Sequence, residues 1–177
     1  MAILLGILVV AAVSTIGDYV WYEVGVPHRM TFGIVHGAVL LAAVGGVIGA
    51  AAGRVMAGLP LGAAAGVGGA LVYYALEAPL GRGAMLAGWA AVWILISILN
   101  VRLLQRPRRS LADGLVRGVI AALAGGLAFY LVGDDLWGRR PPGARNYLTQ
   151  YGLWIVAWAP GILAVGIKPL QGRRVRV

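Results

Sequence analysis

Six apolar stretches, each about as long as a membrane crossing, dominate this 177-residue chain. A helix needs about 20 apolar residues to cross the hydrocarbon of a bilayer. Charged residues make up 12% of the chain, whereas a soluble domain carries about 25%. The stretches lie at about 2–23, 30–54, 59–79, 84–104, 111–133 and 147–168. The sequence therefore predicts an all-α polytopic membrane protein, a single domain over residues 1–177 that forms a bundle of six transmembrane helices.

Proline and glycine punctuate the chain between these stretches, and both residue types interrupt helices. The breaks predicted from them lie at 25–29, 57–60, 78–83, 105–110 and 133–146. Alternating breaks lie on opposite sides of the membrane, so the second and fourth breaks share a side with both ends of the chain.

The basic residues are divided unequally between the two sides. Ten fall on the side of the second and fourth breaks, namely Arg54, Arg102, Arg106, Arg108, Arg109, Arg117, Lys168, Arg173, Arg174 and Arg176. Five fall on the other side, namely Arg29, Arg82, Arg139, Arg140 and Arg145. Because Lys and Arg concentrate in cytoplasmic loops, both the N- and C-termini are predicted to be cytoplasmic. We expect the bacterial cytoplasmic (inner) membrane as the location.

The net charge of +9 indicates nucleic acid as a partner only in a soluble protein. Here the basic residues flank apolar segments, so anionic lipid headgroups at the cytoplasmic face are the expected partners, and no nucleic acid is expected. Asp113 precedes Arg117 by one helical turn, a spacing that predicts an ion pair.

Related patterns recur in successive pairs of spans. Residues 71–74 (LVYY) resemble residues 127–130 (LAFY), and an acidic residue, a loop and a helix with two tryptophans follow each of them. The first two spans follow the plan loosely. The pattern predicts three related helical hairpins of the same orientation, which is a parallel repeat.

Glycines recur at every fourth position in the second and third spans, at Gly45, Gly49 and Gly53 and at Gly58, Gly62 and Gly66. Such a stripe lets two helix backbones approach closely. The two spans are therefore predicted to pack against each other along these glycines.

Ionisable residues inside the spans are costly in lipid and are candidates for function. Asp18, His36 and Glu77 lie in three different spans at similar depth, near the extracytoplasmic side. Together with nearby aromatic residues they predict a ligand-binding pocket open to that side. The residues expected to line it are Asp18, Tyr22, His36, Tyr74, Glu77, Trp89, Trp93, Trp154 and Trp158. The alternative is structural: the tryptophans fill space between glycine-rich helices, and Asp18 or Glu77 pairs with His36, Arg29 or Arg82. In addition, Trp21, Tyr22, Trp137 and Tyr147 fit an aromatic belt at the headgroup level.

Several chemistries suit the polar group. Asp18, His36 and Glu77 are weak candidates for a divalent-cation site, and a carboxylate–histidine set could also carry protons. Acids surrounded by aromatic rings could hold an organic cation. No catalytic motif is present, there is no cysteine, and no catalytic residue or cofactor is assigned.

Three functions remain open: binding or transport of a small solute, an accessory or structural subunit of a larger membrane complex, and a membrane-embedded enzyme acting on a lipid or isoprenoid. In length and span count the chain resembles the substrate-binding subunits of energy-coupling-factor vitamin transporters, which implies solute binding. The resemblance includes no shared motif. Protein partners or a homo-oligomer fit the subunit hypothesis.

Overall fold

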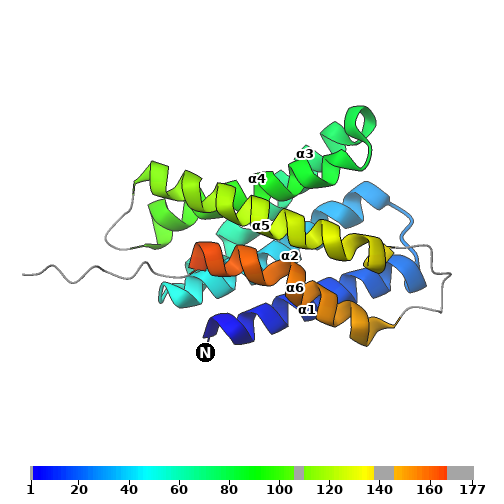
Figure 1. The fold of residues 1–177 in the computed structure, drawn as a ribbon, viewed down its shortest axis with the longest axis horizontal. Coiled ribbons are helices and arrows are strands. Elements are labelled where there is room, and N and C mark those ends of the chain that lie inside the picture. Colours follow the sequence, from blue (N-terminus) through cyan, green and yellow to red (C-terminus); the bar gives the residue numbers. More distant parts are fainter. Residues whose placement is uncertain (1, 106–109, 138–145, 167–177) are drawn as a thin grey trace, which may run out of the picture.

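The computed structural model describes residues 2–105, 110–137 and 146–166, which are helical and contain no strand (Figure 1). The elements are α1 (Ala2–Tyr19), η1 (Val20–Val24), α2 (Arg29–Ala51), α3 (Val55–Leu80), α4 (Gly83–Leu99), η2 (Asn100–Leu104), α5 (Leu111–Trp137) and α6 (Tyr147–Gly166). The π-helical turns η1 and η2 prolong α1 and α4. The six resulting helices are each long and apolar enough to cross a membrane, so the predicted all-α six-span architecture is confirmed.

One of the predicted breaks is displaced along the chain. The second turn lies at residues 52–54, where Gly53 has φ 73°. Pro60 therefore lies inside α3 rather than before it. Pro60 cannot donate a hydrogen bond to the carbonyl of Met56, but Met56 lies at the end of the helix and is 82% exposed. Pro79 is also inside α3, and the chain turns after it at Gly81, where φ is 51°.

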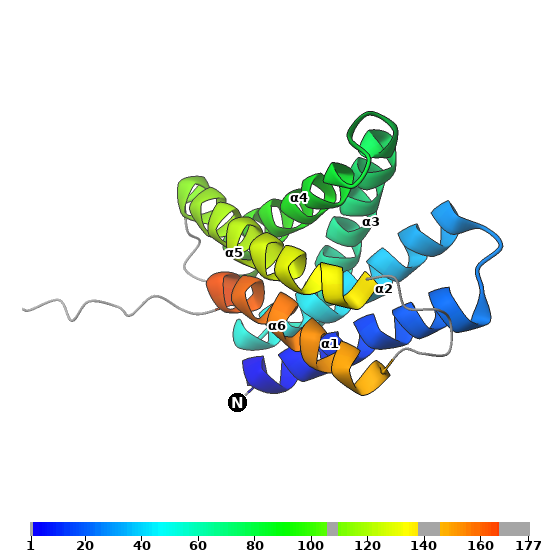
Figure 2. The same ribbon diagram turned by 45° about the vertical axis from the view of Figure 1, so that its right-hand side comes forward.

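The six helices form a closed ring. Each helix packs against the next in the chain, and α6 packs against α1 (Figure 2). The hairpins α1–α2, α3–α4 and α5–α6 all point the same way. We call the end with turns 25–28 and 81–82 the hairpin end, and the end with Ala2, turn 52–54 and Gly166 the termini end.

Glycines hold α2 and α3 in close contact, as predicted. A Cβ atom added to Gly45 would lie 2.7 Å from the Cα of Gly62, and one added to Gly49 would lie 3.1 Å from the Cα of Gly58. Since backbone faces backbone, only hydrogen fits at these positions. The prediction for Gly53 is wrong, because it lies in the turn and a Cβ there would meet nothing within 4 Å.

Packing is dense in the half of the ring near the termini end. Buried side chains fill it, among them Ile7, Val44, Ile48, Leu104, Ile162 and Val165. Polar side chains also join helices there: Asn100 Nδ2 donates to the carbonyl of Val165, and Arg117 Nη1 donates to the carbonyl of Ala164, both at 3.2 Å. The predicted ion pair between Arg117 and Asp113 is confirmed at 3.2 Å.

The hairpin end is more open. There the α3–α4 hairpin stands away from the α1–α2 hairpin (Figure 2). The fold therefore combines a closed half with a half that has room for a cavity.

Candidate functional site

A cavity of about 350 Å³ lies inside the ring, in the half nearer the hairpin end. Side chains or backbone from all six helices line it. Small-molecule sites occupy roughly 300–1,000 Å³, so this cavity has the size of a site for a compact solute.

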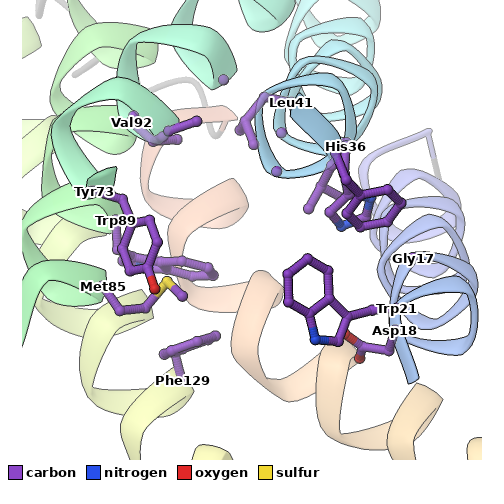
Figure 3. A pocket seen from close by; sticks show the side chains of 18 of the residues that line it. Gly17, Asp18, Trp21, His36, Leu41, Tyr73, Met85, Trp89, Val92 and Phe129 are labelled. Atoms are coloured by element: carbon purple, nitrogen blue, oxygen red, sulfur yellow. The ribbon is translucent and has the colours of Figure 1, made fainter. Parts of the chain in front are cut away.

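Aromatic rings form a large part of its walls. The first two helices, including η1, contribute Trp21, Tyr22, Phe32 and His36. The other four contribute Tyr73, Tyr74, Trp89, Phe129, Trp154 and Trp158. Figure 3 shows Trp21 and Asp18 on one side of the cavity, with Trp89 and Phe129 opposite. Asp18 is the only carboxylate, and Arg29 the only Lys or Arg side chain, among the described residues that line the cavity.

Asp18 is held in the wall by α6. It is 9% exposed, and its Oδ2 accepts hydrogen bonds from Gln150 Nε2 and Trp154 Nε1, both at 2.6 Å. One turn earlier, Ser14 Oγ accepts a hydrogen bond of 2.8 Å from Trp158 Nε1. Two N–H donors on one oxygen suit an ionised carboxylate, because charge-assisted hydrogen bonds of this kind are short and strong.

Helical spacing explains how these polar groups meet. Ser14 and Asp18 are four residues apart on α1, while Gln150, Trp154 and Trp158 follow one another at intervals of four on α6. Side chains four apart share a helix face, so two polar stripes meet where α1 packs on α6. The sequence reasoning missed Gln150 and the role of Ser14, although their spacing from Trp154 and Asp18 was available as a signal.

His36 closes the wall between α1 and α2. Its ring lies parallel to that of Phe32, with 5.6 Å between centroids and 6° between planes. The imidazole lies directly against Gly17, where a Cβ atom would overlap it. The glycine that precedes Asp18 therefore lets the imidazole pack against the α1 backbone.

Glu77 belongs to the mouth of the cavity rather than to its wall. Its Oε1 lies 2.8 Å from Arg29 Nη2 and accepts a hydrogen bond of 3.0 Å from Tyr73. The neighbouring Tyr74 donates to the carbonyl of Arg29 at 2.9 Å, and the Arg29 guanidinium lies 5.9 Å from the centroid of the Trp21 ring. The sequence had suggested, as an alternative to a binding role, that Asp18 or Glu77 pairs with His36, Arg29 or Arg82. The pairing of Glu77 with Arg29 is confirmed.

The structure does not bring together three metal ligands. Among the described residues, no three side chains of His, Cys, Asp or Glu are grouped as a metal ion would require. The suggested set of Asp18, His36 and Glu77 is divided, since the first two line the cavity and Glu77 is engaged with Arg29.

Trp93 is a packing residue. It is fully buried, does not line the cavity, and lies where a Cβ on Gly161 would overlap its ring. The structural alternative therefore holds for this tryptophan, which fills space beside a small residue. Within the described part of the chain, the indole nitrogens of Trp89 and Trp93 and the hydroxyl of Ser97 have no hydrogen-bond partner. These three residues are spaced by four along α4, on the side that faces α5.

Seven of the nine predicted pocket residues line the cavity: Asp18, Tyr22, His36, Tyr74, Trp89, Trp154 and Trp158. Glu77 and Trp93 do not. Trp21 and Tyr22, which were also expected in a headgroup belt, line the cavity from η1. Tyr147 is bound to Glu23 through a hydrogen bond of 2.7 Å, and the side chain of Trp137 lies outside the described residues.

Sequence reasoning also missed Trp21, Phe32, Tyr73 and Phe129 as cavity residues. The repeat offered one signal, because Tyr73 and Phe129 occupy the same place in the two related segments 71–74 and 127–130. Comparison of the chain with models of protein families, with curated proteins and with solved structures gave no match.

Proposed function

We propose that this protein is an integral membrane protein that binds a small organic solute in the aromatic cavity, with access from the extracytoplasmic side. The observation that carries the proposal is the cavity itself: the bundle contains a cavity of about 350 Å³, and its described lining includes ten aromatic rings and one carboxylate. A concave, mainly apolar site with a few placed polar groups is typical of small-molecule binding.

Binding is favoured over free passage through the bundle. The cavity ends where the buried side chains of the termini half begin, and polar contacts such as that between Asn100 and Val165 join the helices below it. Transport would require this half to open, whereas binding requires no rearrangement.

The size of the cavity also argues for a compact solute over a lipid or isoprenoid substrate. A chain long enough to span a leaflet does not fit within this volume. No group of residues in the cavity forms a nucleophile–base pair of the kind that covalent catalysis needs, as far as the described residues extend.

Filling the cavity tests the proposal. Ala70 on α3 lines it, whereas Ala64 on the same helix is exposed and does not. A library of small metabolites is screened for compounds that raise the melting temperature of the purified protein. Hits should stabilise the wild type and Ala64→Leu but not Ala70→Leu. If no compound stabilises the wild type, or if hits stabilise Ala70→Leu equally, the cavity is not a binding site.

A further inference from the structure

We propose that the solute is a compact organic monocation, a protonated amine or a quaternary ammonium, with its charge beside Asp18. This inference rests on the proposed function and specifies the class of ligand. It combines three observations: a carboxylate in the cavity wall, aromatic faces around it, and the pairing of Arg29 with Glu77 at the mouth.

The carboxylate supplies the attraction. Asp18 presents an acidic group to a cavity enclosed by apolar helices, and charges interact more strongly there than in water. Gln150 and Trp154 both donate to Oδ2, which fixes the carboxylate in one orientation. A preorganised anion of this kind attracts a cation without a cost for ordering the side chain.

The aromatic rings supply a second attraction. A cation within about 6 Å of a ring centroid is attracted to the ring face. The structure already contains one such contact, because the Arg29 guanidinium lies 5.9 Å from the centroid of Trp21. Trp21 is less than one turn beyond Asp18 in the chain and lies beside it at the cavity (Figure 3). The same part of the cavity thus offers both a π face and a carboxylate.

Among the described residues, the one basic side chain that lines the cavity has an acidic partner. Arg29 is paired with Glu77 at 2.8 Å, so the basic group at the mouth is accompanied by an acid. An anionic solute, in contrast, would meet the Asp18 carboxylate inside the cavity, where repulsion is also strengthened. The Asp18 carboxylate should therefore favour cationic over anionic solutes. The contribution of the solute's positive charge to its affinity is measured by comparison with a neutral molecule of the same shape.

The tryptophans provide the readout. Among the described side chains, Trp21, Trp89, Trp154 and Trp158 line the cavity, so a bound molecule should alter the intrinsic fluorescence. The probes are choline and its neutral carbon isostere, in which a tert-butyl group replaces trimethylammonium, together with benzyltrimethylammonium and benzoate. We expect saturable fluorescence changes with the two ammonium compounds, and affinities at least about 10-fold higher than that of the neutral isostere.

Two variants locate the charge. Asp18→Asn keeps an oxygen that can accept from Gln150 and Trp154, and it should lower the affinity for benzyltrimethylammonium at least about 10-fold. The matched control is Glu23→Gln, which removes a carboxylate at the same end of the bundle but outside the cavity. It should leave the affinity unchanged. Should Asp18→Asn fail to fold, Trp21→Leu removes the π face beside the carboxylate and is expected to weaken ammonium binding.

The possible failures are distinct. If the neutral isostere or benzoate binds as tightly as the ammonium compounds, the ligand class is wrong while the cavity remains a binding site. If Asp18→Asn and Glu23→Gln lower the affinity equally, the charge beside Asp18 is not the determinant. If the ammonium compounds give no saturable change, the inference is overturned, and the metabolite screen decides separately whether the cavity binds any solute.

Discussion

At Gly45 the backbones of α2 and α3 lie in direct contact, and Gly45→Ala tests whether the two helices pack as described. The added Cβ would lie 2.7 Å from the Cα and 2.8 Å from the backbone nitrogen of Gly62. Carbon atoms pack at roughly 3.5–4.0 Å, so the two backbones must separate by about 1 Å. No rotamer change can relieve this overlap, because the neighbouring atoms belong to the main chain.

The expected net effect is destabilisation. Overpacking costs about 1–3 kcal/mol, and the higher helix propensity of alanine offsets up to about 1 kcal/mol of it. We therefore expect a loss of about 1–2 kcal/mol for Gly45→Ala, measured by unfolding in mixed micelles of increasing dodecyl sulfate content. The matched control is Gly152→Ala on α6, where a Cβ would meet nothing within 4 Å, and it should be neutral or stabilising. Equal stability of Gly45→Ala and the wild type would refute the close packing of α2 on α3.

Two further predictions concern polar groups. Ser14→Ala removes the acceptor of the Trp158 indole N–H. It should lower the free energy of unfolding by about 1–2 kcal/mol, because a buried donor is left without a partner. The control is Ser97→Ala, at a hydroxyl with no partner in the described chain, which should change the free energy of unfolding by less than about 0.5 kcal/mol. Equal losses in micellar unfolding would contradict this contrast. Glu77→Gln breaks the ion pair with Arg29, whose side chain is 59% exposed. It should lower the free energy of unfolding by less than about 1 kcal/mol, because exposed ion pairs contribute little to stability. A melting temperature far below that of the wild type would contradict this expectation.

Much of the fold could be predicted because the constraints are local. Apolar length determines the spans, and glycine spacing predicted the α2–α3 contact. The displaced break at Pro60 has a local cause as well: a proline near the start of a helix removes few hydrogen bonds. The second turn was predicted at Pro60. The chain instead turns earlier, at Gly53, whose positive φ an L side chain rarely adopts.

The site was predictable only in part, because it depends on which helix faces meet. Depth along each span placed Asp18 and His36 together correctly, but depth alone also placed Glu77 with them. The partner of Glu77 is Arg29, the first residue of α2, which lies opposite Glu77 where α2 packs against α3. The contact of Asp18 with Gln150 joins residues 132 positions apart in the chain. It follows from ring closure between α1 and α6. The spacing of the polar residues shows that they share a helix face, but it does not specify which helix that face meets.

Labelling of a single cysteine introduced into the cavity wall tests directly whether the cavity is open to the extracytoplasmic side. The chain has no cysteine of its own, so Ala70→Cys and Ala64→Cys each introduce one thiol, the first in the cavity wall and the second on the exposed side of α3. Intact cells are treated with a membrane-impermeant maleimide. We expect labelling of Ala70→Cys from outside, reduced by benzyltrimethylammonium, and little labelling of Ala64→Cys. Protection of Ala70→Cys until the cells are permeabilised, or equal labelling of both variants, would contradict a solvent-filled cavity that opens at the hairpin end.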